Sequence, residues 1–106
     1  MALSLVNSRA VSARKDYLPQ VTLIITVYNE SARVEQKIAN TLELDYPREK
    51  LEILFASDAA TDGTDDIVRD YSDKGVKLVR CPHRGGKENA QKCAIEQAQG
   101  EIIVFS

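Results

Sequence analysis

Apolar residues along this chain fall into short runs that alternate with stretches of helical spacing. Four runs have the length and β-branched composition of strands covered on both faces, at 21–27, 51–56, 76–79 and 101–106. Between these runs, apolar or small residues recur every three or four positions, which predicts helices over about 31–44, 64–75 and 86–99. The alternation of strand and helix with short connections predicts right-handed βαβ units and a parallel sheet.

Local signals mark the ends of these helices. The residue before Pro47 disfavours the α region, so we expect the first helix to end there. Thr64 is expected to N-cap the second helix, and Gly75 to close it in a left-handed conformation. Ala90, Ala94 and Ala98 give the third helix a face of small residues that can lie close to a sheet.

The chain has 106 residues, room for one domain, and an ordinary composition with 43% hydrophobic and 28% charged residues. A formal net charge of −2 gives no support to a nucleic-acid partner. No apolar run approaches the roughly 20 residues that a membrane helix needs. Cys81 and Cys93 lack the spacing of a metal site, and we expect reduced thiols in the cytosol rather than a disulfide.

The first candidate site follows the first strand, at residues 26–30. At the carboxyl end of a parallel strand, backbone groups point into the ligand crevice, and Tyr28 offers a flat face to a base. Glu30 opens the next helix and is placed to accept a ribose hydroxyl. The alternative is that Asn29 and Glu30 only cap that helix while Tyr28 packs.

The second candidate site follows the second strand, at residues 57–64. Asp58 lies just beyond this strand, where α/β nucleotide folds hold a base or sugar. Asp62-Gly63 has the composition of a turn in which the aspartate bonds its own backbone. An acidic loop at a helix start remains the alternative for both aspartates.

The third candidate site is the segment 84–90, Arg-Gly-Gly-Lys-Glu-Asn-Ala, inside a basic stretch at 80–92. Two glycines and Lys87 before a helix are typical of phosphate binding, because the backbone can approach and the lysine supplies charge. The segment is neither a P-loop nor a dinucleotide fingerprint, since its spacing and position differ from both. An ordinary solvated loop is the alternative.

The three candidate segments span 22–30, 57–64 and 84–90, and the last strand follows at 100–106. In their order and spacing, these four segments together resemble the N-terminal part of family-2 glycosyltransferases with the GT-A fold. The resemblance spans about residues 19–106, with 1–18 left as a leader or linker. Details at 44–51 and 74–78 look most like the cellulose-synthase-like, polysaccharide-building branch. The resemblance implies an α/β, Rossmann-like, three-layer half-domain with four parallel strands in the order 3-2-1-4 and helices on both faces.

That family transfers a sugar from a nucleotide donor, usually a UDP-sugar, to a polysaccharide, lipid or protein acceptor with inversion at the anomeric carbon. The resemblance implies that the uridine pocket is lined by Thr26, Val27, Tyr28 and Glu30. It also implies that Asp58 hydrogen-bonds the uracil or ribose and that Lys87 lies near the diphosphate. Several positions depart from the pattern: Ser57 replaces an aspartate, Ala59-Ala60 replace Gly-Ser, Thr26 replaces a proline and Lys92 an asparagine.

In the family, an aspartate-rich motif that binds Mg²⁺ or Mn²⁺ follows the strand corresponding to 101–106, and the catalytic base lies later. The resemblance therefore places the metal motif just beyond Ser106. We expect the nucleotide-binding half of an enzyme, with no catalytic or metal-binding residue in this chain and no activity by itself. In the order 3-2-1-4 the last strand is an unpaired apolar edge, which predicts self-association through 101–106.

Two other functions stay open at this point. Nucleotidyltransferase-type enzymes share a related start, but they usually place a glycine-rich phosphate loop where Tyr28-Asn29-Glu30 stands here. A non-catalytic interaction module that keeps the fold is the second. We expect a cytoplasmic location, with any attachment to the inner face of the membrane made by segments outside this chain.

Overall fold

The computed structural model describes residues 18–106, so the predicted leader lies almost wholly outside the described residues. A four-stranded sheet in the order β3-β2-β1-β4 forms the centre of the described part. Its strands are β1 (Val21–Val27), β2 (Leu51–Ser57), β3 (Val76–Arg80) and β4 (Ile102–Phe105). Every neighbouring pair is parallel, which confirms both the predicted direction and the predicted order of the strands.

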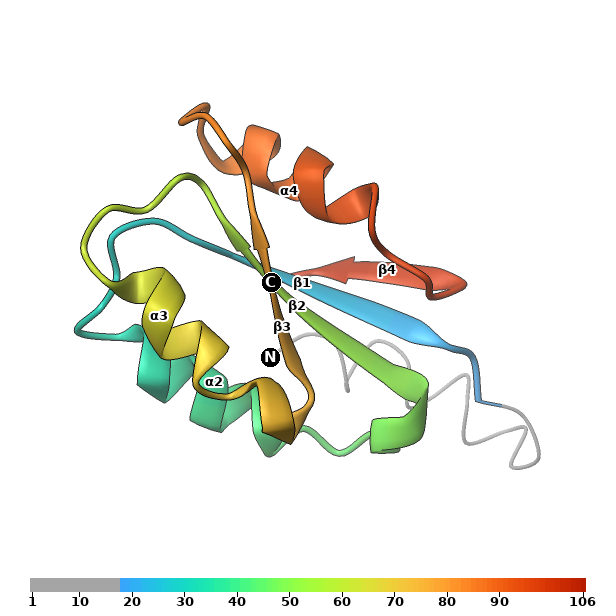
Figure 1. The fold of residues 1–106 in the computed structure, drawn as a ribbon. Coiled ribbons are helices and arrows are strands. Elements are labelled where there is room, and N and C mark those ends of the chain that lie inside the picture. Colours follow the sequence, from blue (N-terminus) through green and yellow to red (C-terminus); the bar gives the residue numbers. More distant parts are fainter. Residues whose placement is uncertain (1–17) are drawn as a thin grey trace.

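Helices cover both faces of this sheet (Figure 1). α2 (Val34–Leu42) and α3 (Thr64–Arg69) lie on one face, and α4 (Lys87–Ile95) lies on the other. Two single turns of 3-10 helix, η1 (Arg48–Lys50) and η2 (Ser72–Lys74), precede β2 and β3. The three predicted layers are therefore present. None of the helices between residues 18 and 106 is long and apolar enough to cross a membrane.

The two faces of the sheet carry cores of unequal size. The larger core lies under α2 and α3 and holds Val21, Leu23, Ile25, Val27, Val34, Ile38, Leu51, Ile53, Phe55, Val68 and Val76. The smaller core lies under α4 and holds Ile24, Leu54, Ala56, Val79, Ala90 and Ala94. Ala90 and Ala94 are fully buried, as the spacing of small residues predicted. Because these side chains are so small, α4 is anchored by much less apolar surface than α2.

Two predicted helix starts are wrong. The first helix begins at Val34 rather than residue 31, because the N–H groups of Arg33 and Val34 both bond the Glu30 carbonyl at 2.8 Å and form a turn. Thr64 is the first residue of α3 rather than its N-cap, a position that Gly63 occupies. The Thr64 N–H instead donates to Asp62 Oδ1 at 3.1 Å.

Two predicted helix ends are also wrong. α3 stops at Arg69, so Gly75, with φ +89°, closes η2 rather than α3. α4 spans only Lys87–Ile95, whereas the sequence pattern extended it to residue 99. In both cases the chain leaves the helix through turns, with Tyr71 bonding the Val68 carbonyl and Ala98 the Ile95 carbonyl, before it reaches the glycine that was expected to close the helix.

Cys81 and Cys93 form a disulfide bond, so the prediction of reduced thiols is wrong. That prediction used only the number and spacing of the cysteines. The pairing depends instead on α4 lying against the end of β3, which brings the two Cα atoms to 5.9 Å, within the range that a disulfide spans.

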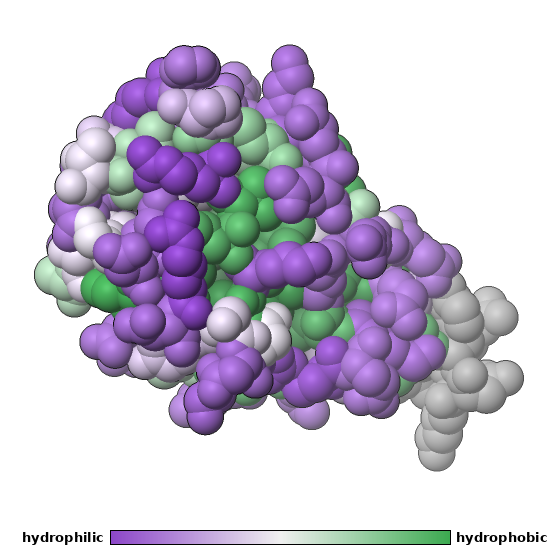
Figure 2. Space-filling model, in the orientation of Figure 1, coloured by the Kyte–Doolittle hydropathy of each residue, from purple (hydrophilic) through white to green (hydrophobic). Residues whose placement is uncertain are grey.

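β4 is an exposed edge strand, so the expectation that 101–106 is buried is wrong. Ile102, Ile103 and Phe105 keep 37%, 36% and 46% of their surface exposed. Within residues 18–106, β4 pairs with β1 alone. Hydrophobic residues gather in the middle of the face shown in Figure 2, between the layer of α4 and the layer of α2 and α3.

The last strand is also shorter than predicted, because it ends at Phe105 and excludes Ser106. The N–H of Ser106 still donates to the Ile24 carbonyl at 2.9 Å, so the hydrogen bonding to β1 continues one residue past the strand. Ser106 is exposed, as is the preceding Phe105. The apolar run therefore predicted the place of the strand correctly and its end wrongly.

Gly100 packs directly against β1 and should not tolerate a side chain. A Cβ there would lie 2.7 Å from both the backbone nitrogen and the hydroxyl oxygen of Thr22. We expect Gly100→Ala to lower the free energy of unfolding by about 2–3 kcal/mol, measured by urea denaturation. Gly63→Ala is the control, since Gly63 has φ +94° but open space around it, and should lose only about 1 kcal/mol. Equal losses would contradict the packing argument.

The exposed β4 edge should promote self-association. We expect the sedimentation coefficient of the chain to rise with concentration, because unpaired backbone groups and apolar side chains on an edge favour pairing between copies. Ile103→Lys should keep the chain monomeric, whereas Gln36→Lys on the exposed side of α2 should leave association unchanged. A single monomeric species of the unmodified chain at every concentration would show that β4 does not self-associate.

Candidate functional site

The residues predicted at the nucleotide site lie together at the carboxyl ends of the strands. A pocket of about 190 Å³ opens there, lined by Thr26, Val27, Tyr28, Glu30, Asp58, Arg84, Gly86 and Lys87. All six residues named from the sequence are among these eight. The loops that follow β1, β2 and β3 meet at this end of the sheet, because the three strands are parallel neighbours (Figure 1).

The loops after β1 and β2 are fastened to each other by side chains. Asn29 Oδ1 accepts the Thr61 N–H at 2.8 Å, and Thr64 Oγ1 accepts the Glu30 N–H at 2.8 Å. Both loops turn through a non-glycine residue in the left-handed region, Asn29 at φ +46° and Ala59 at φ +59°. This region is unfavourable for alanine, whereas glycine, which the resemblance implies at the position of Ala59, adopts it without that cost.

Asp62 takes part in these contacts between the two loops and does not line the pocket. Its carboxylate accepts the N–H of Ser31 at 3.1 Å, the N–H of Thr64 at 3.1 Å and the Thr64 hydroxyl. These hydrogen bonds, that of the Thr64 hydroxyl above all, lower the pKa of Asp62 to about 2. The predicted turn, in which Asp62 bonds its own backbone, is confirmed.

Asp58 is the centre of the site and is almost completely buried, with 2% of its surface exposed. Its Oδ1 accepts the Gly85 N–H at 3.0 Å and the Asn89 side-chain amide at 3.2 Å. Its Oδ2 accepts the Gly86 N–H at 2.6 Å and the Arg84 guanidinium. Each oxygen therefore already has two donors, which is the usual capacity of a carboxylate.

This set of donors keeps Asp58 charged. Burial by itself would raise the pKa of Asp58, but the hydrogen bonds from Gly85, Asn89, Gly86 and Arg84 outweigh burial and hold the pKa below its ordinary value. The ionised carboxylate thus ties the end of β2 to the segment between β3 and α4.

Arg84 stacks on Tyr28 and was not singled out from the sequence. The guanidinium carbon lies 3.6 Å from the centre of the Tyr28 ring, a cation–π contact, while one of its nitrogens bonds Asp58. The guanidinium therefore covers the ring face on which a base was expected. The only available signal was the position of Arg84 beside two glycines in the third segment.

The pocket also carries positive charge at the start of α4. Lys87 is the first residue of α4 and follows Gly86, whose φ of +98° turns the chain into the helix. The free N–H groups of a helix start favour an anion, and an adjacent lysine adds a full charge. The nearby Glu30 carboxylate is neutralised by Lys37, whose Nζ lies 2.6 Å from Glu30 Oε1.

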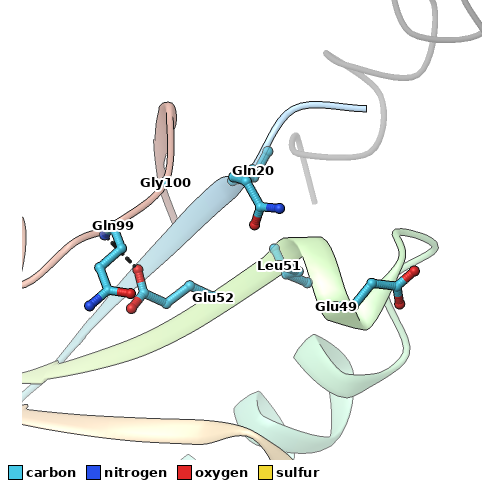
Figure 3. Close-up of a pocket in the computed structure, with 7 residues that line it drawn as sticks. Gln20, Glu49, Leu51, Glu52, Gln99 and Gly100 are labelled. Carbon is cyan, nitrogen blue, oxygen red and sulfur yellow. Dashed lines mark hydrogen bonds between the residues drawn. The ribbon is translucent and has the colours of Figure 1, made fainter. Parts of the chain in front are cut away.

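A larger hollow of about 390 Å³ lies at the other end of the sheet, where the strands begin. Figure 3 shows Gln20, Leu51, Glu49 and Glu52 along it, with Glu52 accepting the Gln99 N–H at 2.9 Å. Its lining includes two carboxylates and no basic side chain, so it disfavours a phosphate ligand. We therefore place the candidate site in the smaller pocket.

Residues 18–106 do not bring three metal-binding side chains together. No group of His, Cys, Asp and Glu in this range is arranged to hold a metal ion. The carboxylates of Asp58 and Asp62 instead accept the hydrogen bonds described above, which hold the loops in place.

Ser106, beyond which the resemblance places the metal motif, is not part of the nucleotide pocket. It lines a separate hollow of about 170 Å³ together with Ile25 of β1 and Lys37, Asn40 and Thr41 of α2. Because its N–H bonds the Ile24 carbonyl, Ser106 nevertheless lies beside Ile25 of β1, which directly precedes Thr26 of the nucleotide pocket. A metal motif directly after Ser106 stays a prediction.

Known proteins that are similar to this chain include the following three. YdaM of Bacillus subtilis, a probable glycosyltransferase, is 33% identical over 91 residues, which cover 81% of this chain and 22% of YdaM. The mannosyltransferase PcManGT from Pyrobaculum calidifontis, solved in complex with GDP-Man and Mn²⁺, superposes with a TM-score of 0.75 at 41% identity. TarS 1–349 from Staphylococcus aureus superposes with a TM-score of 0.75 at 26% identity.

Both structural matches cover 82% of this chain and 26% of the other, so the chain spans about a quarter of the length of these proteins. The superpositions confirm the predicted Rossmann-like α/β fold of the GT-A kind. The model of glycosyl transferase family 2 matches residues 22–106. The chain therefore belongs to glycosyl transferase family 2, as the three segments of its sequence predicted.

Proposed function

We propose that this chain is the donor-binding part of an inverting glycosyltransferase and that the pocket between Tyr28 and Lys87 takes the nucleotide-sugar. The observation that carries the proposal is the lining of one pocket by a stacked aromatic–guanidinium pair, a buried carboxylate and a helix start with its lysine. The stacked pair suits a planar base and the helix start with its lysine suits an anion, while the buried carboxylate holds Arg84 beside Tyr28.

The base belongs at the end of the pocket where Arg84 lies over Tyr28. It stacks either on the outer face of the guanidinium or, if Arg84 moves, on the ring itself. A direct hydrogen bond from Asp58 to the base or ribose stays a prediction. Such a bond requires one of the four present donors to leave the carboxylate. We assign Asp58 chiefly to holding Arg84 and the two glycines in place.

The diphosphate belongs at the start of α4, beside Lys87. There the free backbone N–H groups and the ammonium group meet its charge, while Lys37 keeps the Glu30 carboxylate from repelling it. Uridine as the nucleoside stays a prediction, because PcManGT, which is 41% identical in the matched region, was solved with GDP-Man. Acceptor and linkage are proposed only at the level of the family, as a polysaccharide, lipid or protein.

A divalent cation is expected with the donor in the whole enzyme, since PcManGT was solved with Mn²⁺. The described residues do not fit such an ion by themselves, because no group of three suitable side chains is arranged to hold one. We therefore assign none of its ligands here. The family match argues against the nucleotidyltransferase alternative.

The anion end of the pocket can be tested by titrating the chain with UDP, GDP and ADP and following amide shifts by NMR. We expect Lys87→Ala to weaken binding of the preferred diphosphate about fivefold, the effect of losing one exposed charge pair. Lys92→Ala removes the same charge from the same helix outside the pocket lining and should bind like the unmodified chain. A folded sample that responds to none of the nucleotides would contradict the proposal, as would equal effects of the two substitutions.

The Asp58 contacts can be tested through the pH dependence of stability. A carboxyl group with a lower pKa in the folded state adds stability above its ordinary pKa and loses it as the pH falls through the folded value. Asp58 and Asp62 are both of this kind, and for Asp62 the window runs from pH 3.8 down to about 2. We expect the free energy of unfolding to fall over this range in urea denaturation.

Asp58→Asn should remove part of that pH dependence. At neutral pH it should also cost about 2 kcal/mol, because Arg84 and the N–H groups of Gly85 and Gly86 lose their charged acceptor. Asp66→Asn, on an exposed aspartate of α3, is the matched control and should change neither quantity appreciably. An unchanged pH profile in Asp58→Asn would show that its carboxylate does not hold the loop.

A further inference from the structure

We propose that the Cys81–Cys93 disulfide is a redox switch for the donor pocket, an inference that rests on the function proposed above. The bond joins the end of β3 to the middle of α4 with a sequence separation of 12. The chain that it encloses carries Arg84, Gly85, Gly86 and Asn89, the four donors around Asp58. The same chain carries Lys87.

The two ends of this enclosed segment are held very differently. Cys81 is fully buried, and its N–H donates to the Ser57 carbonyl at 2.9 Å, which extends the pairing of β2 with β3. Cys93 lies on α4, whose contact with the sheet is made mainly by Ala90 and Ala94. Alanine side chains bury little apolar surface, so packing alone holds α4 weakly. The disulfide therefore adds a covalent attachment of α4 to the end of β3.

Opening the disulfide gives the segment 82–92 more conformational freedom. The four donors then surround Asp58 for a smaller fraction of the time, and Arg84 is less often stacked on Tyr28. A nucleotide must order the segment when it binds, which lowers its apparent affinity. The oxidised chain is thus the high-affinity form and the reduced chain the low-affinity form.

The reductant is a dithiol. One of its thiolates attacks Sγ of Cys93, the less buried cysteine, and the S–S bond breaks. Cys81 leaves as a thiolate and takes up a proton. The second thiolate of the reductant then attacks the mixed disulfide and releases Cys93, which is protonated in turn. Two electrons and two protons pass from the dithiol to the protein, and the dithiol becomes a disulfide.

The test compares the chain after treatment with oxidised glutathione and after treatment with dithiothreitol. Alkylation followed by mass spectrometry establishes the state of both cysteines. Without nucleotide, the amides of Gly85 and Gly86 should exchange with solvent about tenfold faster in the reduced chain, because both donate to Asp58. The amides of β1 should not change. In a parallel UDP titration the reduced chain should bind about three- to fivefold more weakly.

Cys93→Ser is the matched variant, since it removes the bond at the half-buried end and leaves Cys81 in place. It should exchange and bind like the reduced chain and should not respond to dithiothreitol. Free thiols after treatment with oxidised glutathione, or equal exchange at Gly85 and Gly86 in the two states, would overturn the switch. Altered exchange in a chain that binds no nucleotide would support redox control of the loop and refute the proposed function.

Discussion

The structure of the site depends on the buried carboxylate of Asp58 and the four donors that surround it. Glycine N–H groups, an amide side chain and a guanidinium converge on it from the segment between β3 and α4. The pKa of the carboxyl is lowered despite burial, so the charge persists at neutral pH. Through this one group the end of β2 fixes Arg84, and Arg84 in turn covers Tyr28 at the end of β1.

The pocket that results is lined mainly by loops, together with the end of β1 and the start of α4. A parallel sheet brings the carboxyl ends of β1, β2 and β3 to one edge, and the bonds between the loops then determine which side chains face the cavity. Asn29 and Ala59 adopt left-handed backbone conformations that surrounding hydrogen bonds stabilise, a feature that often accompanies functional sites. Membership in glycosyl transferase family 2 supports the proposal that this arrangement is a donor site.

Much of the fold could be predicted from the sequence because it follows from periodicity. The order of the motifs predicted which residues of the candidate site lie together. Continuous apolar runs indicated the strands, and the spacing of Ala90 and Ala94 indicated the buried side of α4. All six residues expected at the nucleotide site line the pocket. The rest depends on contacts between distant residues, which no local pattern encodes. The stacking of Arg84 on Tyr28 and the pairing of Cys81 with Cys93 both require the loops to be placed first.

The most direct test of the central claim is a crystal structure of the chain soaked with UDP and, separately, with GDP. The account predicts that the base lies against Arg84 or Tyr28 and that the diphosphate lies at the start of α4 beside Lys87. Nucleotide bound in the hollow lined by Glu49 and Glu52 would contradict the account. So would a pocket that stays empty at saturating concentrations of both nucleotides.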